Sequence, residues 1–250
     1  MKPFLHAQIS AKLFGGHWRD TLPIHDLLDS SKAAHPTMRH RAVLHSELGV
    51  SITRSIFDGR YRSFSSVAPD AEVIAIQHIE DDLGRVPTVA DWAECLRVPN
   101  EAFASLGRLG RSVFREDPAA ACVAQWGGMT TDYRPLIDWF DEPERMTGLR
   151  HAGLLIQNSF GLFVSERVFG TVIEPVVGRC VSVREVGETL LLARYGIIPS
   201  LDSVLRHLEL RPWMYPEPKG RLHAAVSSAL RRRKANRQAL PSVSRISKVT

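Results

Sequence analysis

Phe14-Gly15-Gly16-His17-Trp18-Arg19-Asp20-Thr21-Leu22-Pro23 contains glycines, an aspartate and a proline whose spacing returns later in the chain. Its counterpart is Trp126-Gly127-Gly128-Met129-Thr130-Thr131-Asp132-Tyr133-Arg134-Pro135, which follows without a gap at a shift of 112 in residue number (127 − 15). We call this shift the repeat offset. Glycines and prolines occupy the positions where backbone geometry is most restricted. Their shared spacing therefore indicates a tandem duplication.

The repeat offset continues through turn and core positions of both copies. It pairs Gly49 with Gly161 and Phe57 with Phe169. Further pairs are Asp26/Asp138, Asp29/Asp141, Ile24/Leu136, Leu28/Phe140, Leu44/Ile156, Leu48/Phe160, Ile52/Val164, Ile56/Val168, Gly84/Gly196 and Pro87/Pro199. Because the agreement falls on chain reversals and apolar faces, we prefer a duplication to a chance match.

Helical periodicity dominates both copies. In the first copy, helices are predicted over residues 4–14, from about Asp20 to before Pro36, over 37–48 with a stop at Gly49, and over 76–83. Residues 60–74 and, more clearly, 171–183 predict short β-hairpins. The predicted fold class is mainly α, with a tandem duplication of a small helical unit, a short β-hairpin in each copy and a basic C-terminal helix and tail.

Four segments follow from these patterns. We expect a histidine-rich first unit over residues 1–97, a connecting segment over 98–117, a degenerate second unit over 118–215 and a basic segment over 216–250. From Lys219 onward there are nine lysines and arginines and no acidic residue. Taking these nine from the net charge of +5 leaves −4 for the rest, so the basicity belongs to the tail.

The tail concentrates its charge in Arg231, Arg232, Arg233, Lys234 and Arg237. Such clusters neutralise phosphates and release counterions, so they predict nucleic-acid binding without sequence selectivity. A solvated tail, or one that folds onto the acidic body, is the alternative. A protein partner is a further candidate.

Composition excludes several classes of protein. A hydrophobic share of 44% and a charged share of 24% are typical of a globular protein. No apolar run reaches the roughly 18 residues that span a bilayer, and the N-terminus lacks a secretory signal. Cys95, Cys122 and Cys180 form no Cys-x-x-Cys pair, which argues against a disulfide framework or thiolate zinc site. We expect a cytoplasmic protein with no membrane partner.

Histidines gather at the start of the chain, where seven of the ten fall at or before His78. Two of them precede an aspartate by four positions, as His25-x-x-x-Asp29 and His78-x-x-x-Asp82, so each pair shares one helix face. Imidazole and carboxylate together suit a divalent metal ion such as zinc or manganese. His40 and His45 are five positions apart and diverge by about 140° on a regular helix, so only a distorted helix lets both face one ion.

The second copy lacks these polar groups. His6, His25, His45, His78 and Asp82 correspond to Pro118, Ile137, Gln157, Leu190 and Arg194. These losses predict a cluster confined to the first copy, with metal-ligand candidates His6, His25, His40, His45, His78 and Asp82. A metal-free, hydrogen-bonded core is the alternative. Asp29 keeps an aspartate at its counterpart, which favours a scaffold role, and a one-residue shift would pair Arg39-His40 with Arg150-His151.

The sequence contains no phosphate loop, nucleotide fingerprint or Gly-x-Ser-x-Gly elbow. Because no motif specifies a reaction, we consider two functional hypotheses. One is a metal-dependent phosphoester hydrolase, with catalytic candidates His25, His45, His78, Arg39 and Arg41. Either arginine would bind phosphate there, or form a structural pair with Asp29, Asp81 or Asp82. The other, which we prefer, is a non-catalytic binding or accessory protein, because the second copy keeps the scaffold without the cluster.

Short motifs in the first copy resemble a family of bacterial and phage proteins defined only as a domain of unknown function. They are His6-Ala7, Ser10, Phe14-Gly15-Gly16, Ile24-His25, Asp29, Ser31-Lys32, Arg39-His40-Arg41-Ala42, His45, Gly49, Phe57, Gln77-His78, Asp82, Gly84, Pro87-Thr88 and Asp91-Trp92. The resemblance covers about residues 6–92 and, more faintly, 126–214, and it implies no activity. Ser46, Asp58 and Arg54 depart from the family's histidine, glycine and glutamate, so a site that used that histidine or glutamate would be incomplete here.

Overall fold

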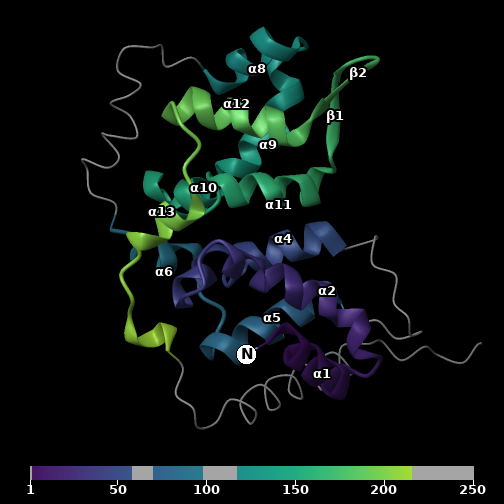
Figure 1. The fold of residues 1–250 in the computed structure, drawn as a ribbon, viewed down its shortest axis with the longest axis vertical. Coiled ribbons are helices and arrows are strands. Elements are labelled where there is room, and N and C mark those ends of the chain that lie inside the picture. Colours follow the sequence, from purple (N-terminus) through teal and green to yellow (C-terminus); the bar gives the residue numbers. More distant parts are fainter. Residues whose placement is uncertain (1, 58–69, 98–116, 216–250) are drawn as a thin grey trace, which may run out of the picture.

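The computed structural model of the protein describes residues 2–57, 70–97 and 117–215. They form two helical lobes stacked along the long axis of the molecule, one from each copy (Figure 1). The first lobe contains α1 (Pro3–Phe14), α2 (Trp18–Asp29), η1 (Ser30–Ala33), η2 (Met38–His40), α3 (Arg41–Leu44), α4 (Glu47–Phe57), α5 (Ala71–Leu83) and α6 (Val89–Ala93), where η denotes a 3-10 helix. The second contains α8 (Pro118–Trp126), α9 (Thr130–Phe140), α10 (Glu142–Thr147), η3 (Arg150–Leu155), α11 (Ser159–Phe169), β1 (Val172–Val176), β2 (Arg179–Ser182), α12 (Val183–Tyr195) and α13 (Leu201–Arg206). The last element of the second copy, η4 (Pro212–Met214), lies beside the first lobe, where Trp213 packs edge-on against Trp92 (Figure 1). The predicted fold class, mainly α, is confirmed.

The duplication is visible in the bounds of the helices. Helices α4 and α11 have equal lengths, and so do α5 and α12. Each pair begins at positions related by the repeat offset, Glu47 with Ser159 and Ala71 with Val183. The chain entry into α4 is repeated as well. The Glu47 amide donates to the Pro87 carbonyl at 3.0 Å, and the Ser159 amide donates to the Pro199 carbonyl at 2.8 Å.

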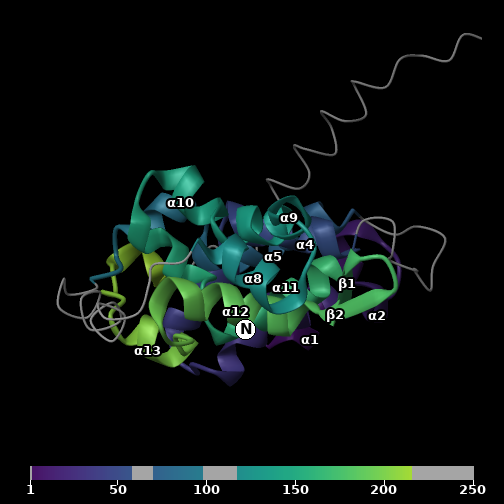
Figure 2. The ribbon, with the colours of Figure 1, turned by 90° about the horizontal axis from the view of Figure 1, so that it is seen from above.

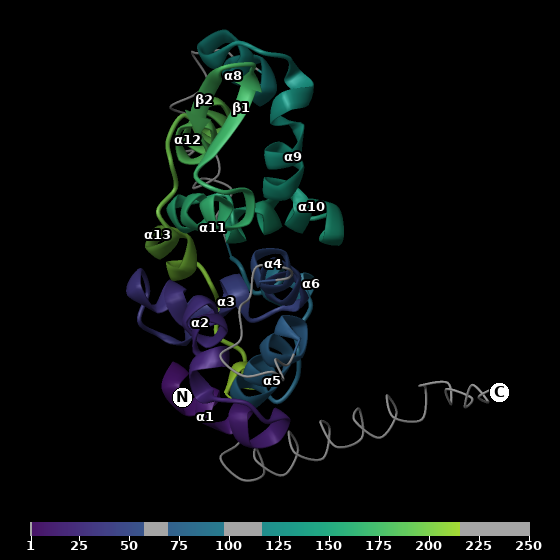
Figure 3. The ribbon, with the colours of Figure 1, turned by 90° about the vertical axis from the view of Figure 1, so that its right-hand side faces the viewer.

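An approximate two-fold axis relates the lobes. Leu96 forms an antiparallel bridge with Leu208, the residue that the repeat offset pairs with Leu96. On either side, the Arg97 amide donates to the His207 carbonyl at 2.8 Å and the Glu209 amide donates to the Cys95 carbonyl at 2.7 Å. The repeat offset converts each of these bonds into the other, which is the signature of a self-complementary interface. Helices α4 and α11 meet at this interface (Figure 3).

The apolar core crosses between the lobes. One cluster of buried side chains joins Ile24, Ile74 and Trp92 of the first lobe to Ile156 and Leu205 of the second. A second cluster lies within the second lobe, between α8, α9, α11 and α12. Helix α6 packs on η3 of the other lobe, and its counterpart α13 packs on η2. The first lobe therefore completes its core with residues of the second.

The expected helix over residues 37–48 is wrong. The chain instead forms η2 and α3, breaks after Leu44, and starts α4 at Glu47, so that Gly49 lies inside a helix. A Cβ atom at Gly49 would lie 1.8 Å from the Leu44 carbonyl oxygen, and one at Gly161 would lie 1.6 Å from that of Ile156. These glycines therefore permit a close backbone approach; they do not end helices.

Helix α2 begins at Trp18, close to the expected start near Asp20. The start of α5 differs from expectation. Helix α5 begins at Ala71 after Asp70, whose side chain accepts from the Glu72 amide at 3.0 Å. This cap places residues 71–74 in the helix, although we expected them in a hairpin or irregular segment. The rest of that segment, residues 60–69, lies outside the described residues.

The hairpin expected over residues 171–183 is confirmed. Strands β1 and β2 pair antiparallel, with Val172 opposite Ser182 and Ile173 opposite Val181, and stand at the edge of the second lobe (Figure 2). Gly178 turns the chain with a φ of +79°, a left-handed conformation that glycine tolerates. Most of the connecting segment (98–116) and the basic residues from Arg231 to Arg237 lie outside the described residues.

No helix in the described parts of the chain combines the length and apolar character needed to span a bilayer. All three cysteines have free thiols; Cys95 and Cys122 are buried and Cys180 is exposed.

Candidate metal centre

Five elements of the first lobe direct polar side chains to one point in its interior. Helix α1 contributes one histidine, α2 a histidine and an aspartate, and α5 another such pair, while one histidine ends η2 and another follows α3. These residues are His6, His25, Asp29, His40, His45, His78 and Asp82. None is more than 4% exposed. The structure thus brings together all six predicted metal-ligand candidates, and adds Asp29.

The broken helix after Leu44 explains how His40 and His45 reach the same point. His45 ends α3 with non-helical backbone angles, φ −97° and ψ 60°. The two imidazole rings cross at 89° with centroids 5.8 Å apart. Trp92, which we expected as a core aromatic, is fully buried, and its indole Nε1 donates to the His45 carbonyl at 2.9 Å. The distortion that a shared site requires is therefore part of the fold.

Four side chains form the larger of two groups of potential metal ligands in the described residues. Asp29, His45, His78 and Asp82 each offer one donor atom, and these atoms all lie within 4.8 Å of one another. His45 Nε2 lies 3.1 Å from His78 Nε2 and 3.4 Å from Asp82 Oδ2. Asp29 Oδ1 lies 3.9 Å from both imidazole nitrogens. Ligands about 2.1 Å from an ion lie about 3.0–3.4 Å apart, so a modest contraction would fit these atoms around one cation.

His40 adds a fifth donor to this set. Its Nδ1 lies 2.5 Å from the Thr37 carbonyl, which only accepts, so Nδ1 carries the proton. The other nitrogen, Nε2, lies 3.6 Å from Asp29 Oδ1 and makes no hydrogen bond. A lone pair at that distance repels a carboxylate unless a proton or a metal ion lies between them. The carbonyl contact thus turns the free nitrogen of His40 towards the donor set, as it does for metal-bound histidines.

A chain of hydrogen bonds orients His25 and His78 from outside the set. The Gln77 amide nitrogen donates to Asp81, so its oxygen must accept from Ser10 Oγ at 2.5 Å. Ser10 Oγ then accepts from His25 Nε2 at 2.9 Å. A neutral His25 therefore has its lone pair on Nδ1, which lies 2.8 Å from His78 Nδ1.

Burial controls the charge of three of these histidines. Desolvation lowers the pKa of His25 to about 3 and that of His45 to about 4. It also lowers the pKa of His78 well below its ordinary value, with the neighbouring imidazoles adding to the effect. All three rings are thus neutral near pH 7, and only a neutral imidazole offers a lone pair to a metal ion.

His6 differs because it lies between two carboxylates. Its Nδ1 is 3.5 Å from Asp81 Oδ2 and its Nε2 is 3.4 Å from Asp82 Oδ1, without hydrogen-bond alignment. Although burial lowers the pKa of His6, these two carboxylates raise it, and the net change is upward. The pKa of Asp82 is lowered, because His45, His6 and Arg41 outweigh the effect of burial.

The two candidate arginines point to different places. Arg41 Nη2 lies 2.7 Å from Asp82 Oδ2, and its Nη1 donates to the Asp82 carbonyl at 3.0 Å. Arg39 points away from the cluster, and its Nε donates to the Leu208 carbonyl of the second lobe at 2.9 Å. His151, its counterpart under the repeat offset, also reaches the other lobe, where its Nε2 lies 3.0 Å from the Ala93 carbonyl, three residues before Leu96, the counterpart of Leu208.

The equivalent place in the second lobe contains a guanidinium group. Arg194 Nη1 lies 2.6 Å from Oδ1 of Asp141, the counterpart of Asp29. Gln157, at the position of His45, donates through Nε2 to Glu144 at 3.0 Å and to Asp141 at 3.3 Å. Its amide oxygen accepts from the Tyr195 hydroxyl. In the second copy, an arginine side chain therefore supplies the positive charge beside the aspartate.

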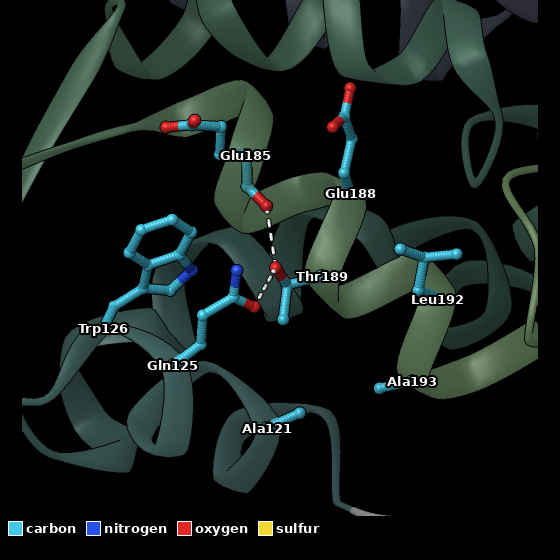
Figure 4. A pocket seen from close by; sticks show the side chains of 8 residues that line it. All are labelled: Ala121, Gln125, Trp126, Glu185, Glu188, Thr189, Leu192 and Ala193. Atoms are coloured by element: carbon cyan, nitrogen blue, oxygen red, sulfur yellow. Dashed lines mark hydrogen bonds between the residues drawn. The ribbon is translucent and has the colours of Figure 1, made fainter.

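The second lobe has a surface pocket near the positions that form the hydrogen-bond chain in the first lobe. A pocket of about 420 Å³ lies between α8 and α12, the counterparts of α1 and α5 (Figure 4). The hydroxyl of Thr189, at the position of Gln77, lies 2.9 Å from both Gln125 Oε1 and the Glu185 carbonyl oxygen and can donate to either. Cys122 stands at the position of Ser10. The orienting chain of the first lobe is therefore absent from this pocket.

Sequence reasoning missed the part that Asp29 plays. We interpreted it as scaffold because Asp141 matches it, although its spacing from His25 equals that of Asp82 from His78. That equal spacing was the available signal. Ser10, Gln77 and Asp81 had no comparable signal, because the chain they form depends on a contact between Ser10 and Gln77, which are far apart in the sequence.

Two of the three positions that depart from the family pattern lie in the described part of the chain. The Arg54 side chain is 63% exposed and lies 3.8 Å from Glu72, outside the cluster. A glutamate at that position would not be a ligand of this site, so the departure leaves the donor set intact. Ser46 is buried beside His45, and Asp58 lies outside the described residues.

Residues 1–101 and 116–214 both match the model of one protein family, described as Domain of unknown function (DUF6915). The two matches cover most of the chain and correspond to the two copies, which confirms the expected resemblance to a family of unknown function. No curated protein and no solved structure matches the chain.

Proposed function

The chain belongs to the DUF6915 family, and we propose that its first copy binds a divalent transition-metal ion within a non-catalytic binding or accessory protein. The ion's ligands would be drawn from Asp29, His40, His45, His78 and Asp82. Three imidazoles and two carboxylates suit zinc and neighbouring transition ions better than magnesium or calcium, which prefer oxygen ligands alone.

The convergence of neutral imidazole nitrogens and carboxylate oxygens in a water-excluded interior carries this proposal. Burying polar groups without partners costs free energy, and a bound cation would satisfy several at once. His40 Nε2, which faces Asp29 Oδ1, is buried without a hydrogen bond. A metal ion would give His40 Nε2 a bonding partner. It would also bind His45 Nε2 and His78 Nε2 together, so that no proton is needed between these two nitrogens.

The second lobe supports the same assignment. There Arg194 supplies positive charge beside Asp141, while the first lobe has Asp82 at the position of that arginine. In the first lobe Lys32 Nζ lies 2.7 Å from Asp29 Oδ1, so the metal-free state has a partial substitute. Lys32 approaches Asp29 from the edge of the cluster, where its side chain is 33% exposed.

Two observations favour binding over phosphoester hydrolysis. The donor side chains are nearly inaccessible, whereas catalytic metal sites keep a coordination position open to substrate. The candidate phosphate-binding arginines also contact protein groups, Arg41 the Asp82 carboxylate within the cluster and Arg39 the Leu208 carbonyl outside it. A closed centre of this kind stabilises a fold or a binding surface.

Metal analysis of protein purified without chelators or affinity metals tests the proposal. We expect zinc, manganese, iron or nickel at near one equivalent or above, and its loss in His78→Leu, which installs the residue found at the equivalent Leu190. His207→Ala, a partly exposed histidine in the second lobe, is the matched control and should keep its metal. Absence of metal from the wild type, also after incubation with zinc, would reject the proposal in favour of a hydrogen-bonded core.

The rival function has its own test. A panel of phosphomonoesters and phosphodiesters is incubated with the metal-loaded protein. Hydrolysis that His78→Leu abolishes, with helical content unchanged by circular dichroism, would replace the accessory role with a metal-dependent hydrolase.

The basic tail supports a second contact, weak binding to nucleic acid through residues 219–250. Its nine positive charges and lack of acidic residues are the basis of this assignment. We expect affinity for DNA or RNA to fall steeply as salt increases, and to be lost in a chain that ends at Pro218. Salt-independent binding, or equal binding by the truncated chain, would exclude the tail as the contact.

A further inference from the structure

We propose that the centre holds two metal ions, with His78 and Asp82 each shared between them. This inference rests on the proposed function for the first ion. The second ion would be bound by His6, His25, His78 and Asp82, on the side of His78 that faces away from Asp29.

His78 presents a different partner to each of its ring nitrogens. Its Nε2 lies 3.1 Å from His45 Nε2, within the first donor set. Its Nδ1 lies 2.8 Å from His25 Nδ1, on the opposite side of the ring. His6, His25 and His78 form a second group whose donor atoms all lie within 4.8 Å of one another. A ring with donors gathered at both nitrogens has the geometry of a bridging ligand.

The two carboxylate oxygens of Asp82 also lie near different partners. Its Oδ2 lies 3.4 Å from His45 and belongs to the first set. Its Oδ1 lies 3.4 Å from Nε2 of His6, a member of the second group. A carboxylate that directs one oxygen to each group of donors is the usual bridge in two-metal centres.

The remaining donors of the second group are oriented from outside. Ser10 accepts from His25 Nε2, which leaves the lone pair of His25 on Nδ1, towards His78. Asp81 lies 3.5 Å from His6 Nδ1 and can orient that ring in the manner of a carboxylate–histidine pair. The His6 ring lies over that of His78, with centroids 4.2 Å apart, so its nitrogen would reach the ion after a side-chain rotation. No hydrogen bond of the His6 ring is lost in that rotation.

The contact between His25 and His78 distinguishes one ion from two. With one ion, His78 keeps a proton on Nδ1 and donates it to His25 Nδ1, which makes His25 an orienting residue. With two ions, the second takes the place of that proton, which leaves to solvent, and both nitrogens become ligands. Charge also permits the second ion, because Asp29, Asp81 and Asp82 together with a deprotonated His78 offset most of the added charge.

Counting zinc in the full-length protein decides the question. Chelator-treated wild type is titrated with zinc, and bound metal is measured by native mass spectrometry and elemental analysis. We expect two equivalents in the wild type and one in both His25→Ile and His6→Gln. Isoleucine is the residue at the equivalent Ile137, and His6→Gln gives a second answer if the first variant does not fold. His207→Ala should bind two.

The number of zinc equivalents bound distinguishes the possible outcomes. One equivalent in the wild type overturns the second ion and leaves the proposed function standing, whereas none overturns both. Two equivalents retained in both variants would show that the second ion lies elsewhere. Copper(II) provides an independent measurement, because coupling through a shared His78 should reduce the paramagnetic resonance signal of the two-copper form below twice that of the one-copper form. An uncoupled signal of full intensity would exclude the bridge.

Discussion

The two copies have the same scaffold and opposite interiors. Around Asp29 the first copy gathers neutral imidazoles and a second carboxylate, Asp82. Around Asp141 the second copy places Arg194 and the amide of Gln157. One lobe thus presents electron-pair donors to the common aspartate position, and the other presents a permanent cation.

This difference separates what the scaffold needs from what the cluster adds. Helices of equal length and the same close approach at Gly49 and Gly161 occur in both lobes, so none of these depends on the histidines. Positive charge beside the aspartate is also common to both, through Lys32 in one and Arg194 in the other. The converging imidazoles are particular to the first copy and are therefore the feature that a function must explain.

Removal of metal should produce the largest difference between the lobes. A ligand present at about 1,000 times its dissociation constant stabilises the folded state by about 4 kcal/mol. For a chain of this size that corresponds to about 10 °C in melting temperature. We expect chelation to lower the melting temperature of the wild type by this amount, measured by calorimetry, and to leave that of His78→Leu unchanged. An equal shift in the variant would place the metal outside the first lobe.

Alanine at the paired glycines tests the common scaffold. Because the new Cβ would overlap a backbone carbonyl oxygen, Gly49→Ala and Gly161→Ala should each destabilise the fold by about 3 kcal/mol or more. Urea denaturation measures both, with the exposed Ser55→Ala as control. Tolerance of alanine in one lobe only would show that the two chain breaks are not equivalent.

Loss of the guanidinium should harm only the second lobe. Arg194→Ala leaves Asp141 and Glu144 without the cation that they share, and partial exposure limits the cost to about 2 kcal/mol. We expect the same decrease in unfolding free energy with and without chelator, and unchanged metal content. Metal loss in this variant would contradict the independence of the two interiors.

The side-chain contacts of Arg39 and His151 with the opposite lobe should have the smallest effect. Arg39→Ala and His151→Ala each remove one hydrogen bond to a carbonyl of the other lobe, which is worth about 1 kcal/mol. Denaturant midpoints of the two variants should decrease by similar amounts. A much larger effect of Arg39→Ala, accompanied by weaker metal binding, would show that the second lobe positions the segment that carries His40.

Local sequence patterns were sufficient for the helical class, the repeat offset and the identity of six clustered side chains. Those features depend on short-range rules: glycine and proline mark chain reversals, apolar residues recur at the helical period, and the loss of five polar groups in one copy identifies a site in the other. The second hairpin was predicted for the same reason, since Val177-Gly178 separates two strand-forming runs.

The way in which these elements meet depends on packing and was not predictable from spacing. Gly49 was expected to end a helix, because sequence does not reveal that the Leu44 carbonyl lies against it. Asp29 was interpreted as scaffold, because its distances to His40 and His45 depend on a chain break that periodicity does not predict. Likewise, Leu96 meets Leu208 through the two-fold arrangement of whole lobes. Spacing along the chain specifies which side chains share a helix face, whereas packing between helices sets which faces converge on one point.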